Sequence, residues 1–251
     1  MTLEVLYVDD EPGLLEIGKE FLEQSGQLHV TICETPSDAI KLLVANKFDV
    51  IISDYQMPET NGVEFLMDIR ANFNGIPFII FTGNSREDVV IMALNAGVSR
   101  YLQKIGDPKS MFAELEHAIL TLGFSAKVKI LLEDEQRFSS LIIDNLPGIF
   151  YMYSYPDVKL IRWNKRHETL LGFSAEELRC RPVLEFHVPE CRDRVTAAIE
   201  EVMTNGSGSV KSIVVAKDGT KIPMFFTGNR FDTGKELFFI GSGIELDRIK
   251  E

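Results

Sequence analysis

The chain has 251 residues, of which 45% are hydrophobic and 25% are charged, and its formal net charge at pH 7 is -12. At roughly 100–150 residues per compact domain, this length predicts two domains. The negative charge argues against nucleic-acid binding as the main function, because phosphate backbones are bound by basic surfaces.

The N-terminal segment lacks the features of an export signal. No basic stretch and no small-residue cleavage site precede the first apolar run, Leu3–Val8. No segment approaches the ~18 consecutive apolar residues that a transmembrane helix needs. The three cysteines, Cys33, Cys180 and Cys191, show no CxxC spacing, which fits a reducing compartment. We therefore expect a cytoplasmic protein without a membrane segment.

Up to about residue 122, short apolar runs alternate with segments of helical periodicity. This alternation predicts βαβ units, and hence a flavodoxin-like, doubly wound parallel sheet of five strands with helices on both faces. The runs VIIS and FIIF are continuously apolar, as is typical of strands buried on both faces. The expected strands are Leu3–Val8, Leu28–Cys33, Val50–Ser53, Phe78–Phe81 and Arg100–Gln103, and the expected helices are Pro12–Ser25, Pro36–Asn46, Gly62–Asn72, Arg86–Ala96 and Pro108–Leu122.

The pattern changes after Gly123. Residues 126–145 are expected to form a separate helix, which Pro147-Gly148 would end. Its apolar stripe is too short and irregular to establish a coiled coil, so packing on a domain face and dimerisation both stay open. The domain prediction is a first domain over residues 1–123, a helical linker over 124–146 and a second domain over 147–251.

The second half predicts a smaller α+β domain with an antiparallel sheet. Two strands and several helices are followed by three more strands, with a hairpin signal at Asp218-Gly219. The expected strands are Ile149–Ser154, Lys159–Trp163, Gly208–Lys217, Lys221–Arg230 and Glu236–Ile244, and the expected helices are Arg166–Leu171, Ala175–Leu178 and Glu190–Met203.

Polar side chains follow four strands of the first domain where each strand ends. Asp9 and Asp10 follow the first strand, Asp54 the third, Thr82 the fourth and Lys104 the fifth. The carboxyl ends of parallel strands share one edge, where such sheets bind ligands. Three nearby carboxylates repel one another. A Mg²⁺ ion, which prefers carboxylate, carbonyl and water oxygens as ligands, would compensate their negative charge. A carboxylate nucleophile, a cation and a lysine together predict a phosphoryl-transfer site.

Four motifs in this region resemble the response-regulator receiver family. They are VDDEP at 8–12, DYQMP at 54–58, TG at 82–83 and YLQK at 101–104. The resemblance covers roughly residues 2–122. It implies that Asp54 is the phosphoacceptor, that Asp10 binds Mg²⁺ directly and that Asp9 binds it mainly through water. The main-chain carbonyl of Gln56 would complete the metal site, and Lys104 would pair with the phosphoryl group.

The same resemblance implies a conformational switch. Thr82 and Tyr101 match the family's switch pair, in which phosphate draws the hydroxyl inward and the ring follows. The output face would be the fourth helix, fifth strand and fifth helix, roughly residues 85–122. One departure concerns the loop after Lys104, where the family's usual proline is missing and Ile105-Gly106-Asp107-Pro108 follows instead.

The second domain resembles the PAS family. Four segments carry the resemblance: RFSSLIIDNLPGIFYM, IRWNKRHETLLGFSAEEL, KDGTKIPMFF and FIGSGIELDRIKE. A PAS pocket holds haem, flavin, a small metabolite or nothing, and the sequence does not identify its ligand or ligand-binding residues. His167 and His187 are expected to be surface or capping residues rather than haem ligands. Cys180 lies too early, and lacks the flanking Asn, for covalent flavin chemistry, so no covalently bound ligand is expected.

These features lead to one main hypothesis and one alternative. The main hypothesis is a phospho-regulated signalling protein without an enzymatic output, limited to self-phosphorylation from small donors and autodephosphorylation. A sensor histidine kinase would be its partner, and a homodimer through the receiver face or the linker helix is left open. The alternative is the N-terminal fragment of a hybrid sensor histidine kinase. No helix-turn-helix segment is evident, so direct DNA binding is not expected.

Overall fold

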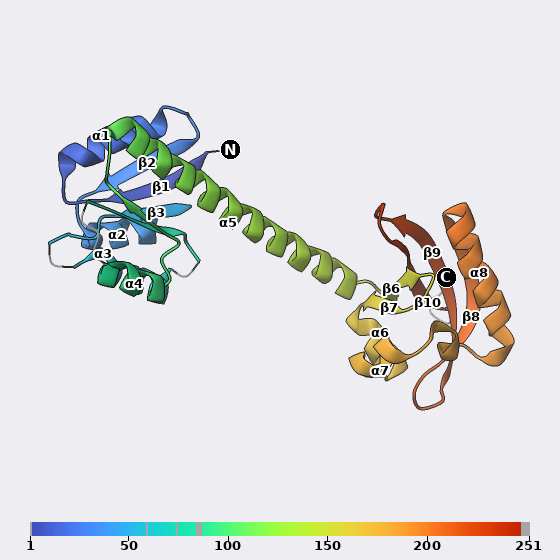
Figure 1. Cartoon of the computed structure of the whole chain (residues 1–251). Helices are drawn as coiled ribbons and strands as arrows, with labels where there is room; N and C mark the ends of the chain where they lie inside the picture. Colours follow the sequence, from blue (N-terminus) through green and yellow to red (C-terminus); the bar gives the residue numbers. More distant parts are fainter. Residues whose placement is uncertain (1, 59, 74, 84–86, 247–251) are drawn as a thin grey trace. The chain divides into compact units, whose positions relative to one another are not determined.

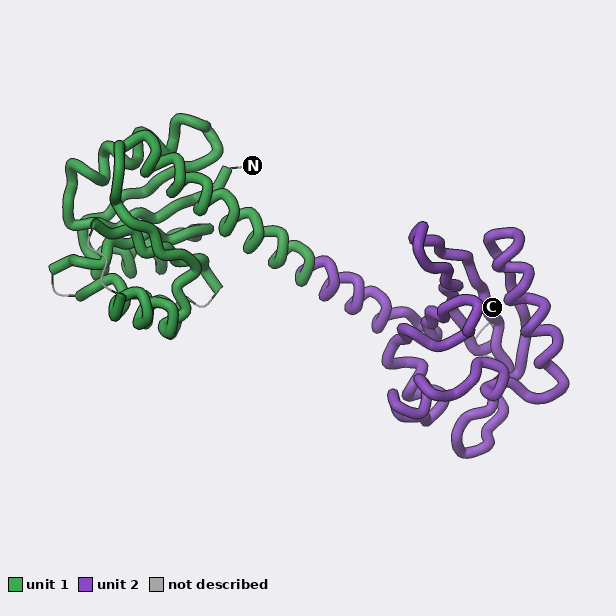
Figure 2. Tube along the Cα trace, in the orientation of Figure 1, with its two compact units in different colours: residues 1–133 green, residues 134–251 purple. Residues whose placement is uncertain are grey.

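The computed structural model describes residues 2–58, 60–73, 75–83 and 87–246. The chain divides into two compact units, residues 1–133 and residues 134–251 (Figure 2). Among the described residues, none of the helices has the length and hydropathy needed to cross a membrane.

Unit 1 contains a parallel five-stranded sheet with the strand order β2-β1-β3-β4-β5 (Figure 1). Every neighbouring pair in it is parallel. The predicted flavodoxin-like fold is therefore confirmed. The strands are β1 (Leu3–Val8), β2 (Leu28–Cys33), β3 (Val50–Ser53), β4 (Phe78–Thr82) and β5 (Arg100–Gln103), and the helices are α1 (Pro12–Glu23), α2 (Pro36–Ala45), α3 (Gly62–Asn72), α4 (Glu87–Asn95) and α5 (Pro108–Asp144).

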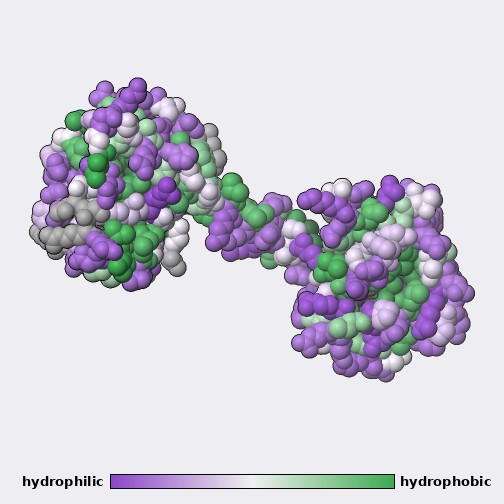
Figure 3. All heavy atoms as spheres, viewed as in Figure 1, coloured by the Kyte–Doolittle hydropathy of each residue, from purple (hydrophilic) through white to green (hydrophobic). Residues whose placement is uncertain are grey.

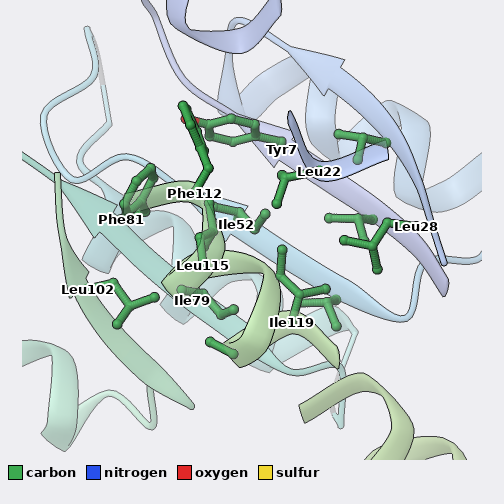
Figure 4. Packing of buried hydrophobic residues seen from close by; sticks show 14 of the residues in the cluster. Tyr7, Leu22, Leu28, Ile52, Ile79, Phe81, Leu102, Phe112, Leu115 and Ile119 are labelled. Carbon is green, nitrogen blue, oxygen red and sulfur yellow. The ribbon is translucent and has the colours of Figure 1, made fainter. Parts of the chain in front are cut away.

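Two hydrophobic clusters cover the two faces of this sheet. Alternate residues of β1 separate between them, because successive side chains of a strand point to opposite faces. Tyr7 packs with α1 and α5, where Phe112 and Ile119 are buried (Figure 4). Val8 packs on the other face with α2, α3 and α4, where Phe65 is buried. Burial on both faces explains why the central strands read as continuous apolar runs.

Helix α5 is longer than the sequence pattern predicted. It runs without a break from Pro108 to Asp144, where two helices separated near Gly123 were expected. Gly123 stays helical and packs against Leu3 and Val50, which leave no room for a side chain at this position. A glycine within a helix is unfavourable by only about 1 kcal/mol relative to alanine, so close packing at Gly123 outweighs the local signal.

Unit 2 contains an antiparallel five-stranded sheet in the order β7-β6-β10-β9-β8. Helices α6, α7 and α8 complete the expected α+β domain, and one face of the sheet carries the buried cluster that includes Tyr151, Leu178 and Phe226. The strands are β6 (Ile149–Tyr155), β7 (Leu160–Trp163), β8 (Ser207–Val215), β9 (Lys221–Asp232) and β10 (Leu237–Glu245), and the helices are α6 (Lys165–Leu171), α7 (Ala175–Cys180), η1 (Val183–Phe186), η2 (Pro189–Cys191) and α8 (Arg192–Asn205).

Asn164 joins the end of α5 to the core of unit 2. Its side chain is fully buried. The side-chain amide donates to the carbonyls of Ile143 (3.1 Å) and Gly148 (2.9 Å). Its carbonyl oxygen accepts from the backbone N–H groups of Phe150 (2.9 Å) and His167 (3.2 Å). One side chain thus ties the linker helix, β6 and the first turn of α6 together.

Candidate functional site

The carboxyl ends of the parallel strands bring the predicted polar residues to one edge of the unit 1 sheet. The backbone N–H of Asp54 donates to the carbonyl of Val8 at 2.9 Å, which places the end of β3 beside the end of β1. The N–H of Lys104 donates to the carbonyl of Thr82 at 2.8 Å, which does the same for β5 and β4. Residues up to 95 positions apart in the chain therefore meet.

Lys104 bridges two carboxylates at this edge. Its Nζ atom lies 2.7 Å from Oδ2 of Asp9 and 2.6 Å from Oδ1 of Asp54. The Tyr7 hydroxyl donates to Asp9 Oδ2 at 3.3 Å, and the Glu11 N–H donates to Asp9 Oδ1 at 3.1 Å. The remaining oxygen of Asp54 accepts a hydrogen bond from the backbone N–H of Gln56. Both carboxylates are therefore held in fixed orientations before any ligand binds.

The site is nearly closed to solvent. Asp9 is 0% exposed, Thr82 1% and Asp54 5%, and the Lys104 side chain is 10% exposed. Because buried carboxylates without a partner would be strongly unfavourable, the lysine ammonium is needed to hold this pair together. The small exposure of Asp54 leaves one carboxylate within reach of an incoming group.

Burial and pairing act in opposite directions on the ionisation of these groups. Burial raises the pKa of Asp54 above its ordinary value and the neighbouring Asp9 adds to this, while the ion pair with Lys104 opposes it. For Lys104, burial lowers the pKa, but hydrogen bonds and charge interactions with Asp54 and Asp9 outweigh it and leave the pKa raised. The ammonium is thus kept charged.

Gly62 shapes the loop that follows Asp54, and the sequence reasoning overlooked it. Its N–H donates to the carbonyl of Tyr55 at 2.9 Å. The backbone of Asp54 and Tyr55 lies so close that a side chain at position 62 would clash with the Asp54 carbonyl. The glycine directly after the Asn61 cap of α3 was the available signal.

The structure brings Asp9, Asp54 and Lys104 into direct contact, whereas Asp10 and Gln56 lie exposed at the rim. Tyr101 on β5 is half-buried and packs against the hydrophobic cluster that includes residues of α2, α3 and α4. The switch roles of Thr82 and Tyr101 and the metal role of Asp10 stay predictions.

The donor set at this edge fits a hard divalent cation in its chemistry. Two carboxylates already share one cationic group, and carboxylate, carbonyl and water oxygens are the ligands that Mg²⁺ prefers. Within the described ranges, however, no three His, Cys, Asp or Glu side chains are grouped so that they could hold a metal ion. The Gln56 carbonyl and water as further ligands of a bound Mg²⁺ stay predictions.

A small space lined mostly by apolar side chains lies in unit 2 against its sheet. Its volume is about 60 Å³, and its lining includes Tyr151, His167, His187 and Phe226. Pockets for drug-sized ligands measure about 300–1,000 Å³, so this space is smaller than a pocket of that class.

The two histidines correct the sequence prediction, because they are buried rather than surface residues, with exposed fractions of 3% for His167 and 6% for His187. Burial lowers the pKa of each to about 4. The Nδ1 atom of His187 lies 2.8 Å from the Ser212 hydroxyl oxygen. The apolar neighbours of His187 in the run EFHV were the sequence signal for burial.

Comparisons with known proteins match each unit separately. Residues 5–116 match the family model described as the response regulator receiver domain, and residues 147–246 match a PAS domain model. The response regulator SaeR of Staphylococcus aureus is 30% identical over 115 residues, which is 46% of this chain and 50% of SaeR. The chain thus spans about half the length of the curated relatives it matches.

Two solved receiver domains are similar to unit 1. The receiver domain of the Francisella response regulator 1452 is 26% identical, with a TM-score of 0.45 over 49% of this chain and 98% of that one. A response regulator receiver domain from Clostridium thermocellum is 27% identical, with a TM-score of 0.46 over 50% of this chain and 98% of that one.

Proposed function

The chain carries a response regulator receiver domain followed by a PAS domain, and from this premise we propose that it is a signalling protein controlled by phosphorylation of Asp54. The observation that carries the proposal is the Lys104 ammonium, which lies within 2.7 Å of both Asp9 and Asp54. A phosphoryl group that arrives at Asp54 brings negative charge, and this lysine is placed to compensate it.

The proposed donor is the phosphohistidine of a partner histidine kinase. A carboxylate oxygen of Asp54 attacks the phosphorus atom, so that an O–P bond forms and the N–P bond breaks. The imidazole leaves with the electron pair and takes up a proton. The Gln56 N–H, already bonded to Asp54, and Lys104 orient the nucleophile. Asp9, Asp10, Asp54 and the Gln56 carbonyl would hold Mg²⁺, which supplies further positive charge to the transferred oxygens.

The output face proposed for the receiver carries large apolar side chains in contact with solvent. Ile91 and Leu94 on α4 are 53% and 61% exposed, and Ile105 after β5 is 64% exposed. A group of exposed apolar residues is typical of a surface that binds another protein. In the proposal, Thr82 senses the phosphoryl group and Tyr101 transmits the change to this face.

The proposal is tested with a small phosphodonor. After incubation with acetyl phosphate and Mg²⁺, intact-mass spectrometry should show one added phosphoryl group. Asp54→Ala should abolish the added mass, whereas Asp68→Ala, which removes an exposed acid of α3, should leave it unchanged. Chelation of Mg²⁺ should prevent the modification. A phosphoryl group still present on the Asp54→Ala protein, which circular dichroism shows to be folded, would refute the assignment.

A further inference from the structure

Tyr7 is a buried tyrosine whose hydroxyl reaches the candidate site from the core of unit 1. It is 0% exposed, and its hydroxyl donates to Oδ2 of Asp9 at 3.3 Å. The Nζ atom of Lys104 lies 2.7 Å from the same oxygen. On the basis of the phosphorylation of Asp54 proposed above, we propose that Tyr7 is a positioning residue. Its hydroxyl holds Asp9 in place when Lys104 turns from Asp9 to a phosphoryl group on Asp54.

The core of unit 1 fixes the position of the Tyr7 ring. Hydrophilic side chains predominate on the face of unit 1 that Figure 3 shows, whereas the ring lies inside, in the cluster that includes Phe112 (Figure 4). On α1, a Cβ atom at position 18 would lie 2.7 Å from Cε1 of Tyr7. Gly18 thus makes room for the ring, although glycine is less favourable than alanine in a helix interior. The hydroxyl is therefore presented to Asp9 from a fixed direction.

The hydroxyl is the weaker of the two partners of this Asp9 oxygen as long as the lysine is present. A phenol carries its proton at neutral pH, and burial and the negative charge of Asp9 raise the pKa of Tyr7 further, so the hydroxyl acts as a donor. Its distance of 3.3 Å exceeds the roughly 2.5–2.7 Å that is typical of a hydroxyl bound to a carboxylate. Lys104 is closer and carries a full charge.

A phosphoryl group on Asp54 would compete with Asp9 for the lysine. The Lys104 ammonium now divides its charge between Oδ1 of Asp54 at 2.6 Å and Oδ2 of Asp9 at 2.7 Å. A phosphoryl group carries up to about two negative charges, and it attracts the ammonium more strongly than a single carboxylate does. Asp9 is 0% exposed, and a buried carboxylate oxygen without a partner is strongly unfavourable. The Glu11 N–H binds Oδ1, which leaves the Tyr7 hydroxyl as the donor that stays with Oδ2.

Removing the lysine reproduces its departure without any phosphoryl group. Lys104→Met leaves Asp9 with the Tyr7 hydroxyl and the Glu11 N–H, so the hydroxyl should contribute more than in the wild type. Tyr7→Phe keeps the ring and removes the hydroxyl. It should lower the urea midpoint of unit 1 about twice as much in the Lys104→Met background as in the wild type. Amide hydrogen exchange of β1 peptides in the full chain, without Mg²⁺ or phosphodonor, measures this midpoint.

Tyr151→Phe is the matched control. It removes the hydroxyl of another buried tyrosine, which donates to the Thr227 carbonyl at 2.9 Å in unit 2, and it should leave the midpoint of unit 1 unchanged in both backgrounds. Equal shifts by Tyr7→Phe with and without Lys104 would overturn the proposal, because a purely structural hydroxyl contributes equally in both backgrounds.

A phosphoryl analogue tests the exchange of partners itself. Trifluoroberyllate with Mg²⁺ imitates a phosphoryl group bound to a carboxylate, and fluorine NMR titration of the full chain measures its affinity. Tyr7→Phe should weaken binding about tenfold, which corresponds to the loss of one hydrogen bond to a charged group. Tyr151→Phe should leave the affinity unchanged, and Asp54→Ala should abolish binding.

The role of Tyr7 and the phosphorylation of Asp54 can fail separately. Equal affinities of the wild type and Tyr7→Phe for trifluoroberyllate would overturn the role of Tyr7 and leave phosphorylation of Asp54 intact. A wild type that binds no trifluoroberyllate would count against phosphorylation of Asp54 and against an exchange of partners there. The unfolding experiment would then still decide whether Tyr7 holds Asp9 when the lysine is absent.

Discussion

Lowering the pH should destabilise unit 2 through its two buried histidines. His167 and His187 have pKa values of about 4 in the folded chain, against about 6.5 in an unfolded chain. Both are therefore neutral when folded at pH 5, whereas unfolding at that pH takes up a proton at each. Stability is fully present above the unfolded pKa and is lost as the pH falls from 6.5 towards 4.

The magnitude follows from the two pKa values. Between pH 7.5 and pH 5, each histidine should reduce the free energy of unfolding by about 2 kcal/mol, and the two together by about 4 kcal/mol. Trp163 on β7 is the single tryptophan of the chain, so its fluorescence during urea denaturation reports on unit 2. The urea concentration at the midpoint of unfolding should be clearly lower at pH 5 than at pH 7.5.

His187→Gln provides the control for this experiment. It removes one titrating group, so the fall in stability should be roughly halved, to about 2 kcal/mol, even though the variant starts from a lower stability. An equal free energy of unfolding at pH 7.5 and pH 5 in the wild type would refute the reasoning. It would mean that the imidazoles accept protons in the folded state without cost.

Two further substitutions test the contacts that hold the site and the linker. Lys104→Met should lower the free energy of unfolding of unit 1 by about 3 kcal/mol, because it leaves two buried carboxylates without a counter-charge, and it should slow phosphorylation of Asp54. Denaturant unfolding measures the first effect and mass spectrometry the second. Lys41→Met, which removes a surface ion pair, is the control and should change neither quantity. Asn164→Ala should lower the stability of unit 2 by about 2–4 kcal/mol because it leaves several buried backbone groups unpaired, and it should speed hydrogen exchange at the end of α5. Unchanged exchange near Ile143 would contradict the role given to Asn164.

Local patterns predicted most of the strands and helices in unit 1. Runs such as VIIS at β3 match strands buried on both faces, and the predicted bounds of β1 and β2 are those of the structure. The site followed from the same pattern, because polar residues at the ends of parallel strands must share an edge. What the pattern did not predict is that Lys104 joins Asp9 and Asp54 directly.

The linker and unit 2 depended on contacts between distant residues. Nothing near Gly123 in the sequence shows that Leu3 and Val50 pack against it, and this packing keeps α5 in one piece. The burial of His167 was likewise hidden, because a lone histidine in a polar helical segment reads as a surface residue. Helical propensity and capping depend on neighbouring residues in the sequence, whereas the burial of Gly123 and His167 depends on residues that pack against them from distant parts of the chain.

The sequence by itself determined the order of elements, the sheet type of each unit and the edge where the acids gather, because apolar periodicity and strand direction are written in consecutive residues. Only the tertiary structure decided which atoms touch: the lysine between two carboxylates, the asparagine that ties α5 to the second sheet, and the burial of the His167 imidazole. Those contacts join residues far apart in the chain, and their energies depend on burial, which no local pattern specifies.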